Sequence, residues 1–372
     1  MKGHIRERSP GHWAIVIDVR DSQTGKRKRR WHSFQGTKRE AQIQRAKLIA
    51  ELQNGNAVDP SRITVAEFLD RFERDWVAPN TTPRTAERYA DSLNHIRQAM
   101  GGAKLQAVKP DRVAALYAGL AREGLAPATI KHLHVVVRCA FKQAQAWGLL
   151  AKNPTDGIKA PKVESEEVKV LEPDEAQALL KRLEGKPLHL LALLALGTGA
   201  RRGELLALRW RDVDLDGATI RIEQALEQTA AGIRIKPPKT KRGRRPIAIN
   251  SHLCEVLRAH WARQQEQRLA FGLGKAPADA TVLAAVDGKP LSPDTVSKQW
   301  ERSMDAIGRG EITLHSLRHT HASMLIAKGM DILTISRRLG HAKPAVTLNV
   351  YGHLIAGTDK EAAQIVEKAF GR

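Results

Sequence analysis

The sequence predicts a mainly α-helical protein with small β-sheets: a small N-terminal β-hairpin or sheet plus a helix, a helical bundle, and a larger mixed α+β domain. Three observations lead to this prediction. Apolar residues alternate within residues 1–35, as in β-strands; they recur every three or four residues over 63–152, as in helices; and both patterns occur after residue 170. At 372 residues the chain is long enough for two or three domains.

The chain carries far more positive than negative charge. It contains 61 Lys+Arg against 40 Asp+Glu, a formal net charge of +21. An excess of this size favours a polyanionic partner, of which nucleic acid is the commonest. A membrane surface is the alternative, but no apolar run approaches the roughly 20 residues that span a bilayer. The longest run, residues 188–196, is predicted to be a buried helix.

Two features predict the compartment. Cys139 and Cys254 are the only cysteines, which excludes a disulfide framework and a Cys-based zinc site. The first residues lack the apolar core of a signal peptide. We therefore expect a reducing cytoplasm and no membrane partner.

The first predicted unit, residues 1–57, is a β-hairpin followed by a helix. Alternating apolar residues predict strands over residues 13–19 and 31–34. A capping box that begins at Thr37 predicts a helix over residues 38–54.

The hairpin carries a run of five consecutive cations: Lys26, Arg27, Lys28, Arg29 and Arg30. Runs of this kind are usually solvated surface. Because Trp13, Trp31 and Phe34 give the hairpin a packing face, we instead interpret it as a β-ribbon that lies in a DNA groove.

The second predicted unit, residues 63–152, is a bundle of four helices that follows a short linker. Prolines begin three of the helices, as is common at the first helical position. Basic residues lie between the apolar stripes; by default they are solvated, but in so basic a chain we interpret them as lining a duplex. They are Arg84, Arg88, Arg97, Lys131, Arg138 and Lys142.

The third predicted unit, residues 170–372, follows a linker over residues 153–169. A glycine-rich stretch at residues 197–203 leads into a helix that begins near Arg202, and Arg201 lies at its start. Backbone N–H groups and the helix dipole favour an anion there. The stretch is not a Walker phosphate loop, because no Gly-Lys-Ser/Thr follows.

Three short strands are predicted after this helix, over residues 218–223, 233–235 and 246–249. The loop before the last strand is strongly basic. It supplies further candidates for DNA contact, Lys241 and Arg242.

Imidazole, guanidinium and phenol groups gather within residues 314–351. His315 and Arg318 are three residues apart and share one face of a predicted helix. A glycine then ends the next helix and leaves His341 on the following loop, shortly before Tyr351. This combination is more typical of a phosphate site than of a core.

The residue types around these motifs narrow the chemistry. No carboxylate pair flanks them, as a metal-dependent nuclease or phosphatase would need. A zinc metalloprotease helix would have Glu after its first His, where this chain has Ser316. Metal-free phosphoryl transfer by a tyrosine is what remains. Tyr351 is the candidate, because Tyr89 and Tyr117 occupy apolar positions of the bundle.

Three blocks in a fixed order resemble the phage integrase family of tyrosine recombinases: T-G-A-R-R-G-E-L-L-A-L-R-W, H-S-L-R-H-T-H-A-S, and L-G-H followed by N-V-Y-G-H. The resemblance covers essentially the whole chain, with an arm-type DNA-binding unit and a SAM-like core-binding bundle before the catalytic domain. It implies a site-specific recombinase of a phage, prophage or other mobile element. Such an enzyme works through a 3′-phosphotyrosine and a Holliday junction, without metal, ATP or another cofactor.

The resemblance also implies a role for each matching residue. Arg201 and Arg318 bind the scissile phosphate, and His341 donates a hydrogen bond to it. His315 assists proton transfer or orients the phosphate. Tyr351 is the nucleophile.

A lysine that protonates the leaving 5′-hydroxyl completes the set. Lys239 matches it, and we favour it over Lys241 because of its Lys-Thr pair. Ala200 replaces the family's usual Leu or Met, which changes packing beside Arg201. Glu204 is expected to be an ion-pair partner of Arg201. The other nearby histidines, expected to pack or to support the site, are His319, His321 and His353.

The resemblance finally implies the partners. These are double-stranded DNA with core-type and arm-type sites and a homotetramer on that DNA, in the nucleoid of a prokaryotic cytoplasm; DNA-bending or directionality proteins stay open as helpers. A terminal helix over residues 359–370 is expected to pack on its own chain or on a neighbour. Two other functions stay open: a type IB topoisomerase and a non-catalytic DNA-binding protein.

Overall fold

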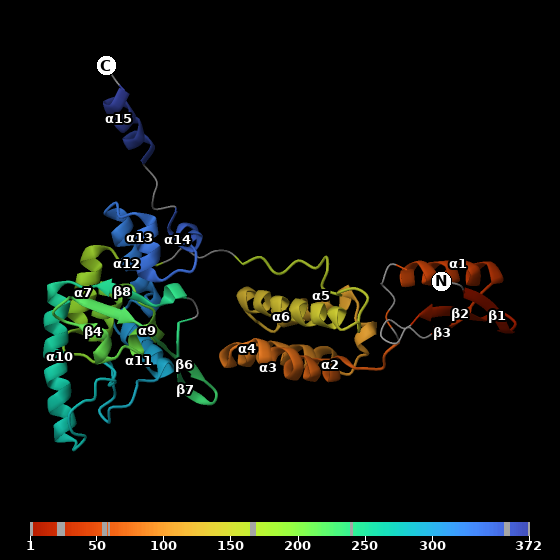
Figure 1. Cartoon of the computed structure of the whole chain (residues 1–372), viewed down its shortest axis with the longest axis horizontal. Helices are drawn as coiled ribbons and strands as arrows, with labels where there is room; N and C mark the ends of the chain where they lie inside the picture. The colour runs from red at the N-terminus through yellow and green to blue at the C-terminus, as the bar shows by residue number, and fades with distance from the viewer. Residues whose placement is uncertain are drawn as a thin grey trace. The chain divides into compact units, whose positions relative to one another are not determined.

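The chain divides into two compact units, residues 1–164 and 165–372, each described here by itself (Figure 1). The division falls within the segment 153–169 that the sequence predicts as a linker. No helix in the described part of the chain is long and apolar enough to cross a bilayer. The computed structural model describes residues 3–20, 27–53, 58, 60–163, 169–238, 241–352 and 358–370.

The first unit begins with a three-stranded antiparallel sheet of order β1-β2-β3, packed against one helix. Its elements are β1 (Gly3–Ser9), β2 (His12–Arg20), β3 (Arg27–Gln35) and α1 (Lys38–Gln53). Ile15, Ile17 and Val19 of the central strand are buried against Leu48 and Ile49 of α1. One face of the sheet is therefore covered by the helix.

The predicted helix start is confirmed, and the sheet contains one strand more than the two that the sequence located. The backbone N–H of Thr37 donates to the Glu40 carboxylate at 2.8 Å, and the Glu40 N–H donates back to the Thr37 hydroxyl at 3.3 Å. Strand β1 was not predicted, because G-H-I-R-E-R-S holds one apolar residue, Ile5, and so shows no alternation.

The two faces of this sheet correct one prediction. The register places Trp31 opposite Val16, one residue out of phase with Ile15 and Ile17. Because side chains alternate between faces, Trp31 lies on the face away from α1, and it is 53% exposed. The prediction that Trp31 shares a packing face with Trp13 and Phe34 is therefore wrong.

The four predicted helices of the bundle are present. The elements are α2 (Val65–Phe72), a π-helical turn (Glu73–Val77), α3 (Ala78–Asn80), α4 (Pro83–Met100), a 3₁₀ turn (Leu105–Ala107), α5 (Pro110–Arg122) and α6 (Pro127–Ala146). Proline occupies the first position of α4, α5 and α6 as predicted. Tyr117 is buried in the core and Tyr89 packs against it, so neither phenol is a surface nucleophile.

The second unit combines helices with two small sheets. Its helices are α7 (Pro173–Leu183), α8 (His189–Thr198), α9 (Arg202–Leu206), α10 (Ser251–Ala270), α11 (Pro293–Asp305), α12 (Leu314–Ala327), α13 (Ile332–Leu339), α14 (Pro344–Tyr351) and α15 (Thr358–Phe370), with 3₁₀ turns at Trp210–Asp212 and Lys241–Gly243. The strands are β4 (Val213–Asp214), β5 (Thr219–Ile222), β6 (Ala225–Thr229), β7 (Gly232–Lys236) and β8 (Arg245–Ala248). Strands β4, β5 and β8 form one antiparallel sheet and β6 and β7 a separate hairpin.

The buried helix α8 organises this unit. Its Leu190, Leu191 and Leu194 lie in the main hydrophobic core, as the apolar run predicted. Helix α8 packs against α12 and ends at Gly199, which adopts a left-handed conformation (φ 65°). This turn brings Arg201, at the start of α9, next to Arg318 on α12. At the C-terminal end of the described residues, Val366 and Phe370 of α15 are exposed.

Candidate active site

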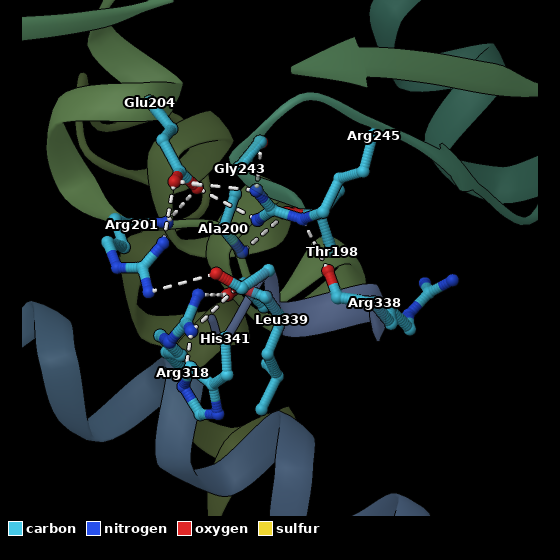
Figure 2. Close-up of polar contacts among 12 residues, drawn as sticks. Thr198, Ala200, Arg201, Glu204, Gly243, Arg245, Arg318, Arg338, Leu339 and His341 are labelled. Carbon is cyan, nitrogen blue, oxygen red and sulfur yellow. Dashed lines mark hydrogen bonds and ion pairs between the residues drawn. The ribbon is translucent and has the colours of Figure 1, made fainter. Parts of the chain in front are cut away.

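Arg318 is the buried centre of the candidate site (Figure 2). Its guanidinium donates to the carbonyl oxygens of Gly199 at 2.6 Å and Leu339 at 2.8 Å. These carbonyls lie at the C-terminal ends of α8 and α13, where helix dipoles favour a cation. Burial, and then repulsion by Arg201, lowers the pKa of Arg318 to about 9. The group therefore stays cationic at neutral pH.

Arg201 faces solvent beside Arg318 and is held by a buried carboxylate. Its side chain is 43% exposed and pairs with Glu204 at 2.8 Å, and its Nη2 lies 3.5 Å from the Gly340 carbonyl oxygen. Figure 2 shows Glu204 between the guanidiniums of Arg201 and Arg245. The Arg245–Glu204 pair is buried at 2.9 Å. The predicted role of Glu204 as an ion-pair partner is confirmed, whereas Arg245 was missed because it lies in sequence among other cations.

Burial by itself would raise the pKa of Glu204, but Arg245 and Arg201 together lower it below its ordinary value. Replacing Glu204 by Gln should therefore destabilise the protein by about 3–5 kcal/mol, because it leaves a buried guanidinium without its anion. The lowered pKa means that this stability is present above the ordinary Glu pKa, roughly 4.3, and is lost as pH falls through the lowered value.

Urea unfolding from pH 7 downward measures this effect. The difference between wild type and Glu204→Gln should shrink below about pH 4. The matched control is Glu301→Gln, at an exposed position of α11, which should stay within about 0.5 kcal/mol of wild type. A Glu204→Gln difference that does not change with pH would contradict the ion-pair account.

His341 lies on the loop after α13, where the sequence predicted it. Gly340 ends the helix in a left-handed conformation (φ 69°). The Nε2 atom of His341 is 2.9 Å from Arg318 Nη2, and its Nδ1 is 2.7 Å from the Thr347 hydroxyl. Because arginine only donates, Nε2 accepts from Arg318 and the Nδ1–H donates to Thr347. Burial, followed by nearby guanidiniums led by Arg318, lowers the pKa of His341 to about 4.

His315 and His319 on α12 form a second cluster with Tyr351 on α14. The rings of His315 and His319 meet edge to face, with centroids 4.5 Å apart. His319 Nδ1 lies 2.6 Å from the Tyr351 hydroxyl. Tyr351 is 2% exposed; burial raises its pKa to about 12, although Arg318 acts in the opposite direction. Desolvation, then the charges of Arg318 and Arg201, lowers the pKa of His315.

The contact between His319 and Tyr351 was not predicted, since the sequence assigned His319 to packing or support. Its spacing of four from His315 is the signal that could have found it. His321 does support the site as expected: it is buried, with Nδ1 2.7 Å from the Leu196 carbonyl oxygen and Nε2 3.0 Å from Arg338. His353 lies outside the described residues.

The basic loop before β8 is described only in part. Lys239 lies outside the described residues, as does the side chain of Lys241, so both stay predictions. Arg242 donates to the carbonyl oxygen of Ala342 at 2.9 Å, which holds the loop beside His341. A cavity of about 420 Å³ lies here, lined by Arg201, Glu204, Lys236, Pro238 and Gly340 among others. Within the described residues, no group of three or more His, Cys, Asp or Glu side chains could hold a metal ion.

The DNA-contact candidates of the bundle separate into two groups. Arg97 is paired with Asp70 at 2.8 Å and with Glu73, so its charge is neutralised within the bundle and the prediction that it lines a duplex is not supported. Arg84 is exposed but pairs with Glu87 at 3.0 Å. Arg138 is exposed too, with its Nη2 atom 3.8 Å from Asp156. The remaining candidates are exposed: Arg88, Lys131 and Lys142.

The five-cation run lies mostly outside the described residues. This holds for Lys26 as a whole and for the side chains of Arg27, Lys28 and Arg30. Arg29 is exposed, with its Nε 3.4 Å from Asp18.

Comparisons with known proteins agree with this fold and with the three blocks. The model of the phage integrase family matches residues 169–357, a little over half of the chain. A XerC-like tyrosine recombinase of Caldanaerobacter subterraneus is 28% identical over 96% of this chain and 96% of its own. An integrase of Streptomyces ambofaciens is 28% identical over 90% of this chain and 88% of its own.

Solved structures share the fold. The Tn1549 transposon integrase, in complex with transposon right end DNA, has a TM-score of 0.69 at 21% identity, over 83% of this chain and 100% of that one. The lambda integrase tetramer bound to a Holliday junction has a TM-score of 0.57 at 23% identity, over 93% of this chain and 94% of that one. The chain therefore belongs to the phage integrase family and is a tyrosine-type site-specific recombinase.

Proposed function

We propose that this recombinase cuts DNA with Tyr351 as the nucleophile and reseals it without metal or nucleotide. The Tyr351 oxygen attacks phosphorus, the bond to the 5′-oxygen breaks, and a 3′-phosphotyrosine and a 5′-hydroxyl result. A 5′-hydroxyl of the partner strand then attacks the phosphotyrosine and releases the tyrosine. Because the phosphodiester energy is kept in the covalent bond, no ATP is needed.

One observation carries the proposal: two guanidiniums and an imidazole converge on one point next to the only phenol of the second unit. Arg318 donates a hydrogen bond to His341, and Arg201 lies beside them at the Gly340 carbonyl oxygen. The Tyr351 hydroxyl is hydrogen-bonded to His319, on the same helix as Arg318. Fixed guanidiniums of this kind stabilise the charge that develops on the phosphate oxygens. The proposed proton donor to the 5′-oxygen is Lys239.

His341 must change its proton position to bind phosphate. In the structure its Nε2 accepts from Arg318, whereas a hydrogen bond to a phosphate oxygen needs a proton on Nε2. The Thr347 hydroxyl at Nδ1 can either accept or donate, so it tolerates both forms of the ring. We infer that this switch accompanies phosphate binding, when Arg318 turns from His341 to the phosphate.

A nicked suicide substrate tests the proposal. The wild-type protein, with EDTA and without ATP, should form an SDS-stable protein–DNA adduct and then transfer the strand to a second duplex. A requirement for metal or ATP would contradict the mechanism. Relaxation of supercoiled DNA without exchange of strands between duplexes would instead be the behaviour of a type IB topoisomerase, the alternative function that the sequence left open.

The assembly is proposed to be a tetramer on DNA. The lambda integrase relative forms a tetramer on a Holliday junction, and the Tn1549 relative binds its transposon end. The net charge of +21 supports DNA as the partner of this chain too. The action on DNA also supports a cytoplasmic, nucleoid-associated location.

The open face of the N-terminal sheet is the proposed arm-site surface. By register, His4 lies opposite Val16 and Arg6 opposite Ala14, so both share the face of exposed Trp31. The guanidinium of Arg8 lies 5.7 Å from the Trp31 ring centroid. This face, rather than the cation run alone, offers cations and an aromatic ring to DNA.

Deleting residues 1–57 should remove one class of DNA site and keep the other. In a binding-site selection experiment, the full chain should enrich two classes of sequence and the truncated protein only the core-type class. Cleavage of a core-type suicide substrate should persist after truncation. Enrichment of the same classes by both proteins would contradict the arm-site assignment.

A point substitution refines this test. Arg6→Ala should reduce the slope of log K against log salt by about 0.9 if Arg6 neutralises one phosphate. Lys47→Ala removes the same charge at an exposed position of α1 and is the matched control, with little change expected. Equal slopes of log K against log salt for the two variants would contradict the proposal that DNA contacts the open face of the sheet.

A further inference from the structure

Helix α14, which carries Tyr351, is hydrogen-bonded to two histidines of the active site through two of its side-chain hydroxyl groups. Thr347 and Tyr351 are four residues apart and are its two buried residues. The Thr347 hydroxyl contacts His341 at 2.7 Å, and the Tyr351 hydroxyl contacts His319 at 2.6 Å. Val346 and Leu348 on the same helix are exposed. The helix is thus attached along one narrow face.

In this arrangement Tyr351 is unable to attack a phosphate of duplex DNA. Its side chain has almost no solvent contact, since it is 2% exposed, and its oxygen already has a partner in His319. An attacking oxygen must come within roughly 3–3.5 Å of phosphorus. The phenol must therefore leave its present position before cleavage.

The proton of this hydrogen bond stays on the tyrosine. Burial, followed by the charges of His315 and Arg318, lowers the pKa of His319 to about 4. Burial raises the pKa of Tyr351 to about 12. The contact is therefore a neutral bond from the phenol to the imidazole, which holds the phenol without activating it.

We propose that His319 is a positioning residue that holds Tyr351 in a buried resting position, so that the bond between them must break before DNA is cleaved. The inference rests on the proposed role of Tyr351 as the nucleophile. The Tyr351 ring is also buried in the small hydrophobic cluster of α12 and α13, and Val350 packs against this cluster. The hydrogen bond adds a directed contact to this packing and fixes the position of the phenol oxygen.

Two substitutions separate the hydrogen bond from the packing. His319→Phe keeps a ring against His315 and Tyr351 but removes the acceptor, which leaves a buried phenol hydroxyl without a partner. His319→Asn keeps a hydrogen-bonding atom close to the position of Nδ1. If His319 acted only by packing its ring, His319→Phe would keep Tyr351 in its buried position and His319→Asn would not. The proposed role predicts the reverse, with Tyr351 held in His319→Asn and released in His319→Phe.

The first measurement is nitration by tetranitromethane of the full-length protein without DNA, mapped by mass spectrometry. The chain has three tyrosines, which makes each site easy to follow. In wild type, Tyr351 should react more slowly than the partly buried Tyr89. In His319→Phe, Tyr351 should react severalfold faster, and in His319→Asn close to the wild-type rate. Faster nitration of Tyr351 than of Tyr89 in wild type would overturn the resting position without any variant.

The second measurement is the single-turnover rate of adduct formation on a nicked suicide substrate at saturating DNA. His319→Phe should form the adduct roughly 2- to 10-fold faster than wild type. This factor corresponds to the net free energy of the one hydrogen bond that no longer has to break before cleavage. A slower His319→Phe with unchanged nitration would overturn the proposal, since the bond would then assist attack. If wild type forms no adduct at all, the proposed function fails instead, while nitration still reports on the resting position.

Discussion

Replacing Tyr351 by Phe should abolish the covalent protein–DNA adduct on a nicked suicide substrate while DNA binding stays intact. The substitution removes the attacking oxygen but keeps the ring that packs against Ile335 and Leu339. It also removes the bond to His319 without leaving a buried hydroxyl unpaired. Denaturing gels should therefore show no adduct above background, and a mobility shift should show wild-type affinity.

Tyr117→Phe is the matched control for this prediction. Its hydroxyl is also buried and lies 3.2 Å from an imidazole nitrogen, that of His134, in the bundle. The same atom is thus removed from the same kind of contact. Tyr117→Phe should form adduct like wild type. An adduct that persists in Tyr351→Phe would place the nucleophile elsewhere.

Replacing Arg201 by Gln should slow cleavage by about 10²- to 10³-fold, as the loss of one fixed donor to a developing anion typically does. The side chain is 43% exposed, so the protein should fold, and Glu204 keeps its buried partner Arg245. The rate is measured under single-turnover conditions at saturating DNA, which separates chemistry from binding.

Arg258→Gln is the control for charge. Arg258 is exposed on α10 and pairs with Asp216 at 3.1 Å, and its loss changes the net charge by the same amount. It should leave the rate unchanged. If both variants lost only affinity and neither lost rate, Arg201 would act through general electrostatic attraction and not at the phosphate.

Local signals in the sequence predicted local structure well. The capping box at Thr37, the prolines that begin α4, α5 and α6, and the left-handed stop at Gly340 are all present. In each case the physical cause lies within a few residues: a cap satisfies free N–H groups, proline has no N–H to lose, and glycine tolerates positive φ. Such causes can be read without knowing the tertiary fold.

Features that depend on distant segments were missed or wrong. Trp31 is exposed because the strand register places its side chain on the face of the sheet away from α1. Arg97 forms ion pairs with two carboxylates that lie 24 and 27 residues away in the sequence. The bond between His319 and Tyr351 spans 32 residues, and Arg245 meets Glu204 across 41. The sequence identified the residue types of the site, whereas folding decides which of them pair with one another.

Mapping the covalent adduct tests the central claim most directly. Wild-type protein trapped on a suicide substrate is digested with protease and nuclease, and the peptide that carries the residual nucleotide is sequenced by mass spectrometry. We predict a phosphodiester between Tyr351 and the 3′ end of the cleaved strand, with a free 5′-hydroxyl on the released fragment. A nucleotide attached to any other residue, or joined through its 5′ end, would contradict the account.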